Sequence, residues 1–175
     1  TQSFDVSDKL LTPTQVDESG RLVKEFDGKT ATHAYAEALD VSQDQLEETI
    51  FLNPLALVLD PTDPFVRSGR VVDLETIGYQ CRIIEGMEMH LLKSRNIVED
   101  TRKELERKSQ ELGGISGLVN FHCALRTVEL QKKGQMEAYG ALFKDLPAVG
   151  YGTFGELYLG MVNHSSTMLL FGQPQ

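Results

Sequence analysis

Residues 94–123 read SRNIVEDTRKELERKSQELGGISGLVNFHC, a helical pattern followed directly by a strand pattern. The first part predicts an amphipathic helix that begins at Ser94, because its apolar residues fall on one side and charged residues occupy the others. The pair Gly113-Gly114 ends this helix, since glycine readily adopts the left-handed conformation that follows helices. The apolar run 115–124 then predicts a strand. The apolar side of the helix consists of Ile97, Val98, Thr101, Leu105 and Leu112.

The flanking sequence extends this pattern in both directions. Upstream, Asp27-Gly28 is a strong turn signal after a strand, Thr30 is placed to cap a helix, and Pro54 stops another. Downstream, the sequence predicts a second amphipathic helix, which Gly134 weakens. The order of elements favours an α+β fold, with a largely antiparallel sheet and two main amphipathic helices packed on it. We expect helices over 31–39, 44–52 and 127–146, and strands over 22–26, 55–60, 65–74, 76–84, 87–92, 115–124, 148–154, 156–161 and 166–171.

Length and charge restrict the class of protein. The 175 residues suffice for one domain, which we expect over 20–175 after a polar arm at 1–19. The net charge of −9 argues against binding to nucleic acid or anionic membranes, since both need a basic patch. No apolar run is long enough to cross a bilayer and no signal peptide opens the chain, so we expect a cytoplasmic protein. The first residue is Thr1 rather than Met, which suggests a piece of a longer protein.

The cysteines and histidines give no strong catalytic or metal-binding signal. Cys81 and Cys123 are expected to be reduced thiols, and the histidines lack the spacing of metal ligands. His122 and Cys123 are neighbours in the predicted strand, so their side chains point to opposite faces and form no catalytic dyad. We therefore expect no metal, no cofactor and no enzymatic activity.

Six short motifs occur in order along residues 20–172. The motifs are Phe26-Asp27-Gly28-Lys29 with Ala31 and Tyr35, Phe65-Val66-Arg67, Glu85-Gly86, Cys123 with Arg126, Gly150-Tyr151-Gly152 through Gly155-Glu156, and Asn163-His164-Ser165. Together they resemble the C-terminal half of FIST sensory domains (FIST C), although family members usually have glycine where this chain has Thr127.

This resemblance implies a non-catalytic intracellular sensory domain within a signal-transduction protein. Such a domain would bind a small-molecule ligand, such as an amino acid or a related small acid. Its expected partners are a signalling output domain or partner protein and the N-terminal FIST half, which normally precedes this one.

The chemistry of the motif residues suits an amino-acid ligand. The guanidinium of Arg126 would bind a carboxylate, Glu156 would accept from an ammonium group, and Asn163 would supply a neutral donor and acceptor. Glycine allows backbone to approach a ligand closely. The candidate ligand-binding residues are Arg126, Glu156, Asn163, His164, Cys123, Arg67, Gly152 and Gly155, and we expect the groups around positions 126, 156 and 163 to share one concave surface.

Structural roles remain open for the same residues. Arg126 and Glu156 could form a salt bridge, the glycines could be hairpin corners, and His164 could be a core histidine. One alternative function is a protein-interaction module with an exposed apolar patch. A less favoured alternative is an enzyme that depends on Cys123.

Overall fold

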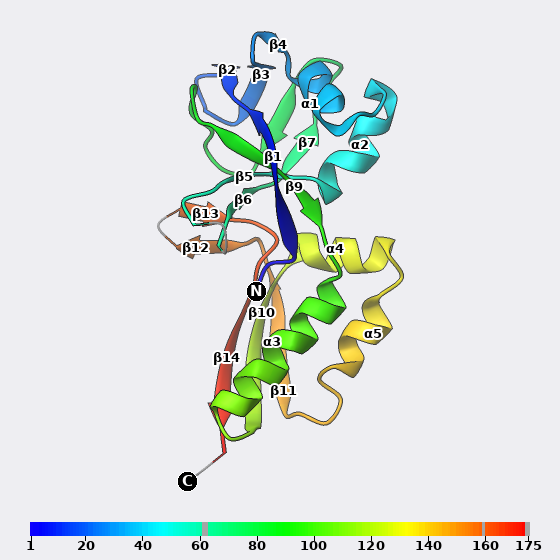
Figure 1. The fold of residues 1–175 in the computed structure, drawn as a ribbon, viewed down its shortest axis with the longest axis vertical. Coiled ribbons are helices and arrows are strands. Elements are labelled where there is room, and N and C mark those ends of the chain that lie inside the picture. Colours follow the sequence, from blue (N-terminus) through cyan, green and yellow to red (C-terminus); the bar gives the residue numbers. More distant parts are fainter. Residues whose placement is uncertain (61–62, 159, 174–175) are drawn as a thin grey trace. The chain divides into compact units, whose positions relative to one another are not determined.

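The computed structural model describes residues 1–60, 63–158 and 160–173 (Figure 1). The chain divides into two compact units. We call Phe4–Ser94 the N-terminal unit, and Thr1–Ser3 with Arg95–Gln175 the C-terminal unit.

The N-terminal unit contains two sheets. One has the strand order β1-β9-β5-β6, and the other has the order β2-β3-β8-β7 with β4 paired to β3. All of its strand pairs are antiparallel among the described residues. The strands are β1 (Phe4–Leu11), β2 (Pro13–Val16), β3 (Leu22–Phe26), β4 (Lys29–Thr30), β5 (Leu55–Leu57), β6 (Phe65–Arg67), β7 (Gly69–Val71), β8 (Ile77–Tyr79) and β9 (Met89–Ser94).

Two helices and two 3₁₀ turns complete this unit. They are α1 (Ala31–Leu39), α2 (Leu46–Thr49) and the turns Gln43–Gln45 and Ile50–Leu52. Tyr35 of α1 is fully buried, packs edge-on against Phe26 at 6.2 Å between ring centroids, and donates to the Asn53 carbonyl at 2.7 Å. The helical region ends before Pro54, as expected. Thr30 is the N-cap residue of α1, but its side chain makes no capping hydrogen bond.

The C-terminal unit begins with the long helix α3 (Ile97–Glu111). Its N-cap is Asn96, two residues after the predicted start, and the Asn96 side chain accepts hydrogen bonds from Val98 N–H and Glu99 N–H. At the other end Gly113 has φ 66°, and Gly114 N–H donates to the Ser109 carbonyl at 2.8 Å. This pairing is a Schellman motif, so the predicted glycine stop is confirmed.

The second predicted helix is divided in two. It forms α4 (Ala124–Lys132) and α5 (Met136–Ala141), and between them Gly134 has φ 64°. Burial of the helices creates a shared apolar cluster of Ile97 and Val98 from α3, Leu130 from α4, and Tyr139 from α5.

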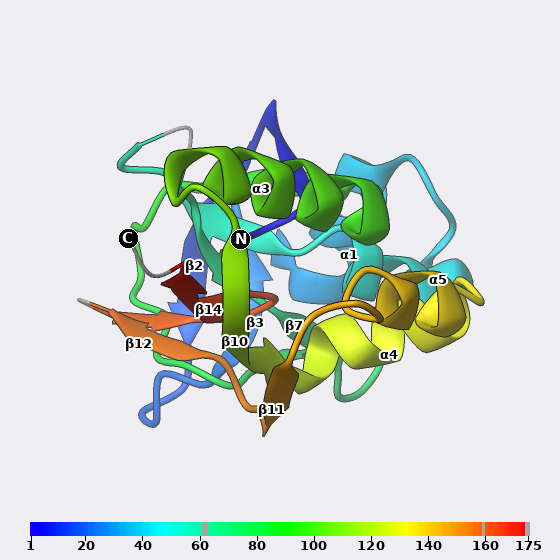
Figure 2. The same ribbon diagram turned by 90° about the horizontal axis from the view of Figure 1, so that it is seen from below.

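The sheet of this unit has the order β11-β10-β14, formed by β11 (Ala148–Thr153), β10 (Ile115–Cys123) and β14 (Ser166–Gly172). Directly paired residues point to the same face. Val119 pairs with Val149 of β11 and with Leu169 of β14, so these residues share the outer face. Asn120 and His122 lie on the opposite face, which α3, α4 and α5 cover (Figures 1 and 2).

The structure confirms the α+β fold with a largely antiparallel sheet arrangement. One exception is the parallel pairing of β10 with β11. The strand expected over 156–161 is instead a hairpin of β12 (Glu156–Tyr158) and β13 (Gly160–Val162), whose residue 159 lies outside the described residues. The expected polar arm at 1–19 contains β1 and β2, while the domain boundary at residue 20 stays a prediction.

Candidate functional site

Arg126 lies near the start of α4, directly after β10, as the sequence predicted. Its side chain is only 1% exposed. Nη2 donates to Thr101 Oγ1 of α3 at 3.2 Å, and Nη1 contacts Ser3 Oγ and the His164 carbonyl, both at 3.5 Å. Burial lowers the pKa of the guanidinium. Arg126 is therefore enclosed by protein groups, and it joins α3, α4 and the loop before β14.

The acidic side chain that accompanies Arg126 is Glu129, not the predicted Glu156. Glu129 is 1% exposed, and its Oε1 accepts from Lys133 Nζ at 2.7 Å. Its Oε2 lies 3.7 Å from His164 Nδ1. Burial, and then the positive charge of Arg126, lower the pKa of His164 to about 3. The His164–Glu129 contact is consequently one between a neutral imidazole and a carboxylate at neutral pH. Glu129 lies on the predicted helix at i+3 from Arg126, and this spacing was the signal available in the sequence.

Glu156 and Asn163 are held by the β12–β13 hairpin. Glu156 pairs with Val162. Among the described residues, Glu156 Oε1 has no hydrogen-bond partner and no ion pair joins this carboxylate to Arg126. Asn163 is fully buried, and its amide contacts the Phe154 carbonyl at 3.5 Å. The expected opposite-charge pairing of positions 126 and 156 is not formed, and their ligand-binding role stays a prediction.

The two candidate glycines differ in what surrounds them. Gly155 has φ 120°, and a Cβ atom there would lie 2.5 Å from the Val162 carbonyl oxygen. Gly152 pairs with His122 on β11, and a Cβ atom added to Gly152 would have its nearest neighbour 4.0 Å away. Gly155 is thus required by the hairpin, as expected for a strand corner, whereas Gly152 has no such close contact.

The remaining two candidates are also buried. Cys123 has no exposed surface and its backbone N–H donates to the Ser165 carbonyl at 3.0 Å, at the junction of β10 and α4. Arg67 belongs to the N-terminal unit, where it is 7% exposed. Burial raises the pKa of Cys81, and the positive charge of Arg67 opposes this rise in part. His122 Nδ1 lies 3.1 Å from the Tyr139 hydroxyl.

A cleft of ≈ 370 Å³ opens in the C-terminal unit. Its walls come from β10, β11, α4 and α5, and none of its lining residues is charged. Apolar side chains form most of the wall, including Leu118, Leu130, Met136 and Phe143.

Three polar side chains lie together in the wall of this cleft. Asn120 Oδ1 accepts from Ser166 Oγ at 2.8 Å, and Asn120 Nδ2 donates to the Tyr139 hydroxyl at 3.3 Å. The same hydroxyl lies 3.1 Å from His122 Nδ1. Sequence analysis missed Asn120 and Tyr139, because their meeting depends on the packing of α5 against β10.

His122 is held as a neutral imidazole. Burial, and then the charge of Arg126, lower its pKa to about 4. Its Nε2 atom is buried and has no hydrogen-bond partner among the described residues.

Comparison with known protein families shows the family to which the chain belongs. The FIST C domain matches residues 31–158, which is more than half of the 175 residues. The chain belongs to the FIST C domain family. No curated protein and no solved structure matches it.

FIST C domains are a sensory, non-catalytic type of domain. In this FIST C domain the matched range includes Arg126, Glu129 and the cleft residues on β10, β11, α4 and α5, but ends before Asn163. No helix within the described ranges has the length and apolar character needed to cross a membrane. Nor does that part of the chain contain a cluster of three or more potential metal-ligating side chains.

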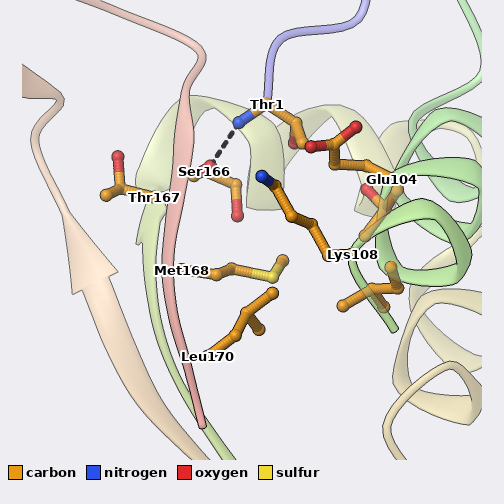
Figure 3. A pocket seen from close by; sticks show the side chains of 9 residues that line it. Thr1, Glu104, Lys108, Ser166, Thr167, Met168 and Leu170 are labelled. Atoms are coloured by element: carbon orange, nitrogen blue, oxygen red, sulfur yellow. Dashed lines mark hydrogen bonds between the residues drawn. The ribbon is translucent and has the colours of Figure 1, made fainter. Parts of the chain in front are cut away.

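A smaller pocket of ≈ 210 Å³ lies between α3 and β14 in the same FIST C unit (Figure 3). Met168 and Leu170 line it from the strand, while Glu104 and Lys108 line it from the helix. The Thr1 amino group donates to the Ser166 carbonyl at 2.5 Å beside it. Charged side chains therefore line this pocket, whereas the lining of the larger cleft carries no charge.

Proposed function

We propose that this FIST C domain is a non-catalytic sensory domain of a signal-transduction protein, and that it binds a small ligand in the cleft between β10–β11 and α4–α5. The observation that carries the proposal is the combination of an uncharged, largely apolar cleft with a cluster of polar side chains in its wall.

The size and the lining of the cleft support this proposal. Small-molecule sites in proteins are mostly apolar cavities of roughly 300–1,000 Å³ with a few polar groups that orient the ligand. The cleft volume of ≈ 370 Å³ lies at the lower end of that range. Leu118, Met136 and Phe143 supply apolar contact, and the Asn120–Tyr139–His122 chain supplies the polar groups.

The cleft is a better candidate site than the position between Arg126 and Glu156. Arg126 is 1% exposed and already bonded to Thr101, so a ligand could reach it only after these contacts opened. The cleft needs no such rearrangement, since it is already open between its walls. Arg126 then acts on the cleft through its charge, which reaches His122.

Filling the cleft tests this proposal. Gly140 lines the cleft, and a Cβ atom at this position would have no heavy atom within 4 Å. Gly140→Leu should occupy the cleft without a clash, and Ala138→Leu is the matched control because Ala138 is exposed on the same helix and does not line the cleft. A bound ligand raises the thermal midpoint by mass action.

We expect compounds that raise the midpoint of the wild-type protein and of Ala138→Leu to leave the midpoint of Gly140→Leu unchanged. Equal shifts in the two variants would place the binding elsewhere and contradict the proposal.

A protein-interaction module is the second candidate function, and the outer face of the β11-β10-β14 sheet favours it. Val149, Tyr151, Leu169 and Phe171 on this face are 67%, 65%, 55% and 51% exposed. Exposed apolar patches often mark protein contacts. The partner expected from the family is the N-terminal FIST half.

A substitution on this outer face tests the second function. Leu169→Ser should weaken the binding of the N-terminal FIST half, whereas Gly140→Leu in the cleft should leave this binding unchanged. The opposite pattern would contradict the second function.

A further inference from the structure

Strand β11 lies at the edge of its sheet and borders the cleft. It pairs with β10 on one side, and within the described residues no strand pairs with its other side, which we call the free edge. Residues 148–152 of β11 are all exposed, and Ala148 and Gly150 line the cleft. An unpaired strand edge presents backbone N–H and C=O groups that can pair with a further strand.

Two hydrogen bonds of β10 show which of its residues bond to β11. Leu118 N–H donates to the Pro147 carbonyl on the β11 side, and Cys123 N–H donates to the Ser165 carbonyl on the β14 side, both at 3.0 Å. Consecutive residues of a strand direct their N–H and C=O groups to opposite sides. The even-numbered residues of β10 therefore bond to β11, and the odd-numbered residues bond to β14.

The parallel pairing carries this alternation over to β11. Leu118 is paired directly with Ala148, and in a parallel pair the hydrogen bonds of one residue run to the residues before and after its partner. The N–H and C=O groups of Ala148, Gly150 and Gly152 consequently face the free edge. A Cβ atom added to Gly150 would clash with the Asn120 carbonyl oxygen, as expected for a residue that turns its Cα–H, rather than its N–H, toward β10.

The cleft provides space for a side chain beside this free edge. Ala148 and Gly150 lie on the face that the helices cover, since they pair with Leu118 and Asn120 of that face. Their small size leaves room between β11 and α5, and Gly140 lines the opposite wall. A strand added along β11 would direct alternate side chains to this face, so that one of them enters the cleft.

We infer that the cleft takes a short extended peptide, whose backbone pairs with the free edge of β11 and whose apolar side chain lies against Leu130, Met136 and Phe143. In strand addition of this kind, backbone hydrogen bonds supply affinity and side-chain pockets supply specificity. The inference rests on the proposed function, since it names the ligand class for the same cleft.

Charge selects the side chain that enters the cleft. Among the described residues that line the cleft, none is an aspartate, glutamate, lysine or arginine. Burial, and then the charge of Arg126, lower the pKa of His122 to about 4, so its imidazole is neutral at pH 7. A charged side chain would lose hydration in the cleft without gaining an ionic partner. We therefore expect an uncharged, apolar side chain at this position of the peptide.

Capped tripeptides test the side-chain part of the inference. The parent peptide is N-acetyl-alanyl-leucyl-alanine methylamide, and two further peptides replace its leucine by glutamate or lysine. Amide titrations of the ¹⁵N-labelled wild-type protein should show binding of the parent, and binding about 10-fold or more weaker for both charged peptides. A charged peptide that binds as tightly as the parent would contradict the assigned side chain.

N-methylation of the peptide tests the backbone pairing. Two isomers of the parent carry one N-methyl group, either on the leucine nitrogen or on the nitrogen of the following alanine. In an extended strand only one of these two N–H groups can face β11, so one isomer should lose about 10-fold in affinity and the other should bind nearly as the parent does. Equal affinities of both isomers, whether as tight as the parent or weaker, would overturn the inference.

The outcomes distinguish the ligand class from the site. An uncharged compound without a peptide backbone, 3-phenylpropanol, serves as the comparison. If it binds, Gly140→Leu removes this binding and the parent peptide does not bind, the cleft is the site but the peptide assignment is wrong. If no probe binds, or if Gly140→Leu leaves the binding of every probe unchanged, the proposed function itself fails.

The free edge can be measured without any ligand. Hydrogen exchange in the folded protein should be fast at the amides of Ala148, Gly150 and Gly152, and slower at Val149 and Tyr151, whose N–H groups bond to β10. Addition of the parent peptide should slow the exchange at Gly150. Equal protection of all five amides before the peptide is added would overturn the inference.

Discussion

At the scale of single residues, the side chain of Arg126 lies in the interior of the C-terminal unit. Its 1% exposure and its bond to Thr101 make it part of the interior. A buried charged group is tolerated only when its neighbours satisfy it, and here the interactions of Arg126 include one with Glu129. Removing one member of such a cluster leaves the others buried and uncompensated.

Arg126→Met should therefore lower the free energy of unfolding by about 3–5 kcal/mol. Arg102→Met is the matched control, because Arg102 bonds to Glu99 on the exposed side of α3 and should cost no more than about 1 kcal/mol. Urea unfolding measures both values. Equal losses in the two variants would show that the interior contacts of Arg126 add nothing to stability.

The two histidines of lowered pKa predict an acid sensitivity. His164 has a pKa of about 3 and His122 a pKa of about 4 in the folded protein, against an ordinary value of 6.5. As the pH falls below about 6.5, these two histidines bind protons in the unfolded chain but stay neutral in the folded protein, so the free energy of unfolding decreases. Above that pH both states are neutral at these positions and the contribution is constant.

Between pH 6.5 and 5, we expect His164 to lower the free energy of unfolding by about 0.7 kcal/mol per pH unit at first, with the slope rising toward about 1.4 kcal/mol per pH unit as the unfolded histidine becomes protonated. Urea unfolding at several pH values should give a shallower slope for His164→Gln than for the wild-type protein. His33→Gln, at an exposed position of α1, should keep the wild-type slope. An unchanged slope in His164→Gln would mean that His164 is not held neutral by burial.

At the scale of elements, residues at the two ends of helix α3 determine where the helix begins and ends. Asn96 accepts from two backbone N–H groups at the start, and Gly113 adopts φ 66° at the end. Asn96→Ala should lower stability by about 1 kcal/mol through loss of the cap. Lys103→Ala, in the exposed middle of the helix, should be nearly neutral. Thermal unfolding checks both, and an equal effect would contradict the assigned cap.

The β12–β13 hairpin depends on Gly155 in the same way. Gly155→Ala would place its Cβ 2.5 Å from the Val162 carbonyl in a backbone conformation that disfavours side chains, and should cost more than about 1 kcal/mol. Gly152→Ala meets its nearest atom at 4.0 Å and should cost much less. Urea unfolding measures the free energy of unfolding of both variants. Similar losses in the two variants would show that the close contact at Gly155 does not determine the stability of the hairpin.

The elements also show how far the sequence predicts this fold. Apolar periodicity and the glycine pair predicted α3 and β10, and the turn signal at Asp27-Gly28 was right because both residues have positive φ. The division of the helix at Gly134 was underestimated, since one glycine in a helical pattern does not by itself specify a break. The side-by-side placement of β11, β10 and β14 depends on pairings between distant residues that no local pattern contains.

At the scale of the whole molecule, the family could be predicted from the order of short motifs, and the match over residues 31–158 confirms it. The cleft proposed as the binding site was harder to predict than the family. The motif residues near positions 126, 156 and 163 are largely interior, whereas the cleft uses Asn120 and Tyr139, which belong to none of the motifs. Their polar contacts arise only when α5 packs on the inner face of the sheet, so residue types and spacing alone did not show them.

The central claim is that the cleft between β10–β11 and α4–α5 binds a small molecule. Chemical-shift mapping of the ¹⁵N-labelled protein with 3-phenylpropanol, a small uncharged aromatic compound that matches the uncharged and largely apolar lining, tests it most directly. We predict that the changes concentrate at 118–122, 136–143 and 148–151, which contain most of the cleft lining. Changes centred instead on Glu156 and Asn163, with the cleft residues unaffected, would contradict the claim.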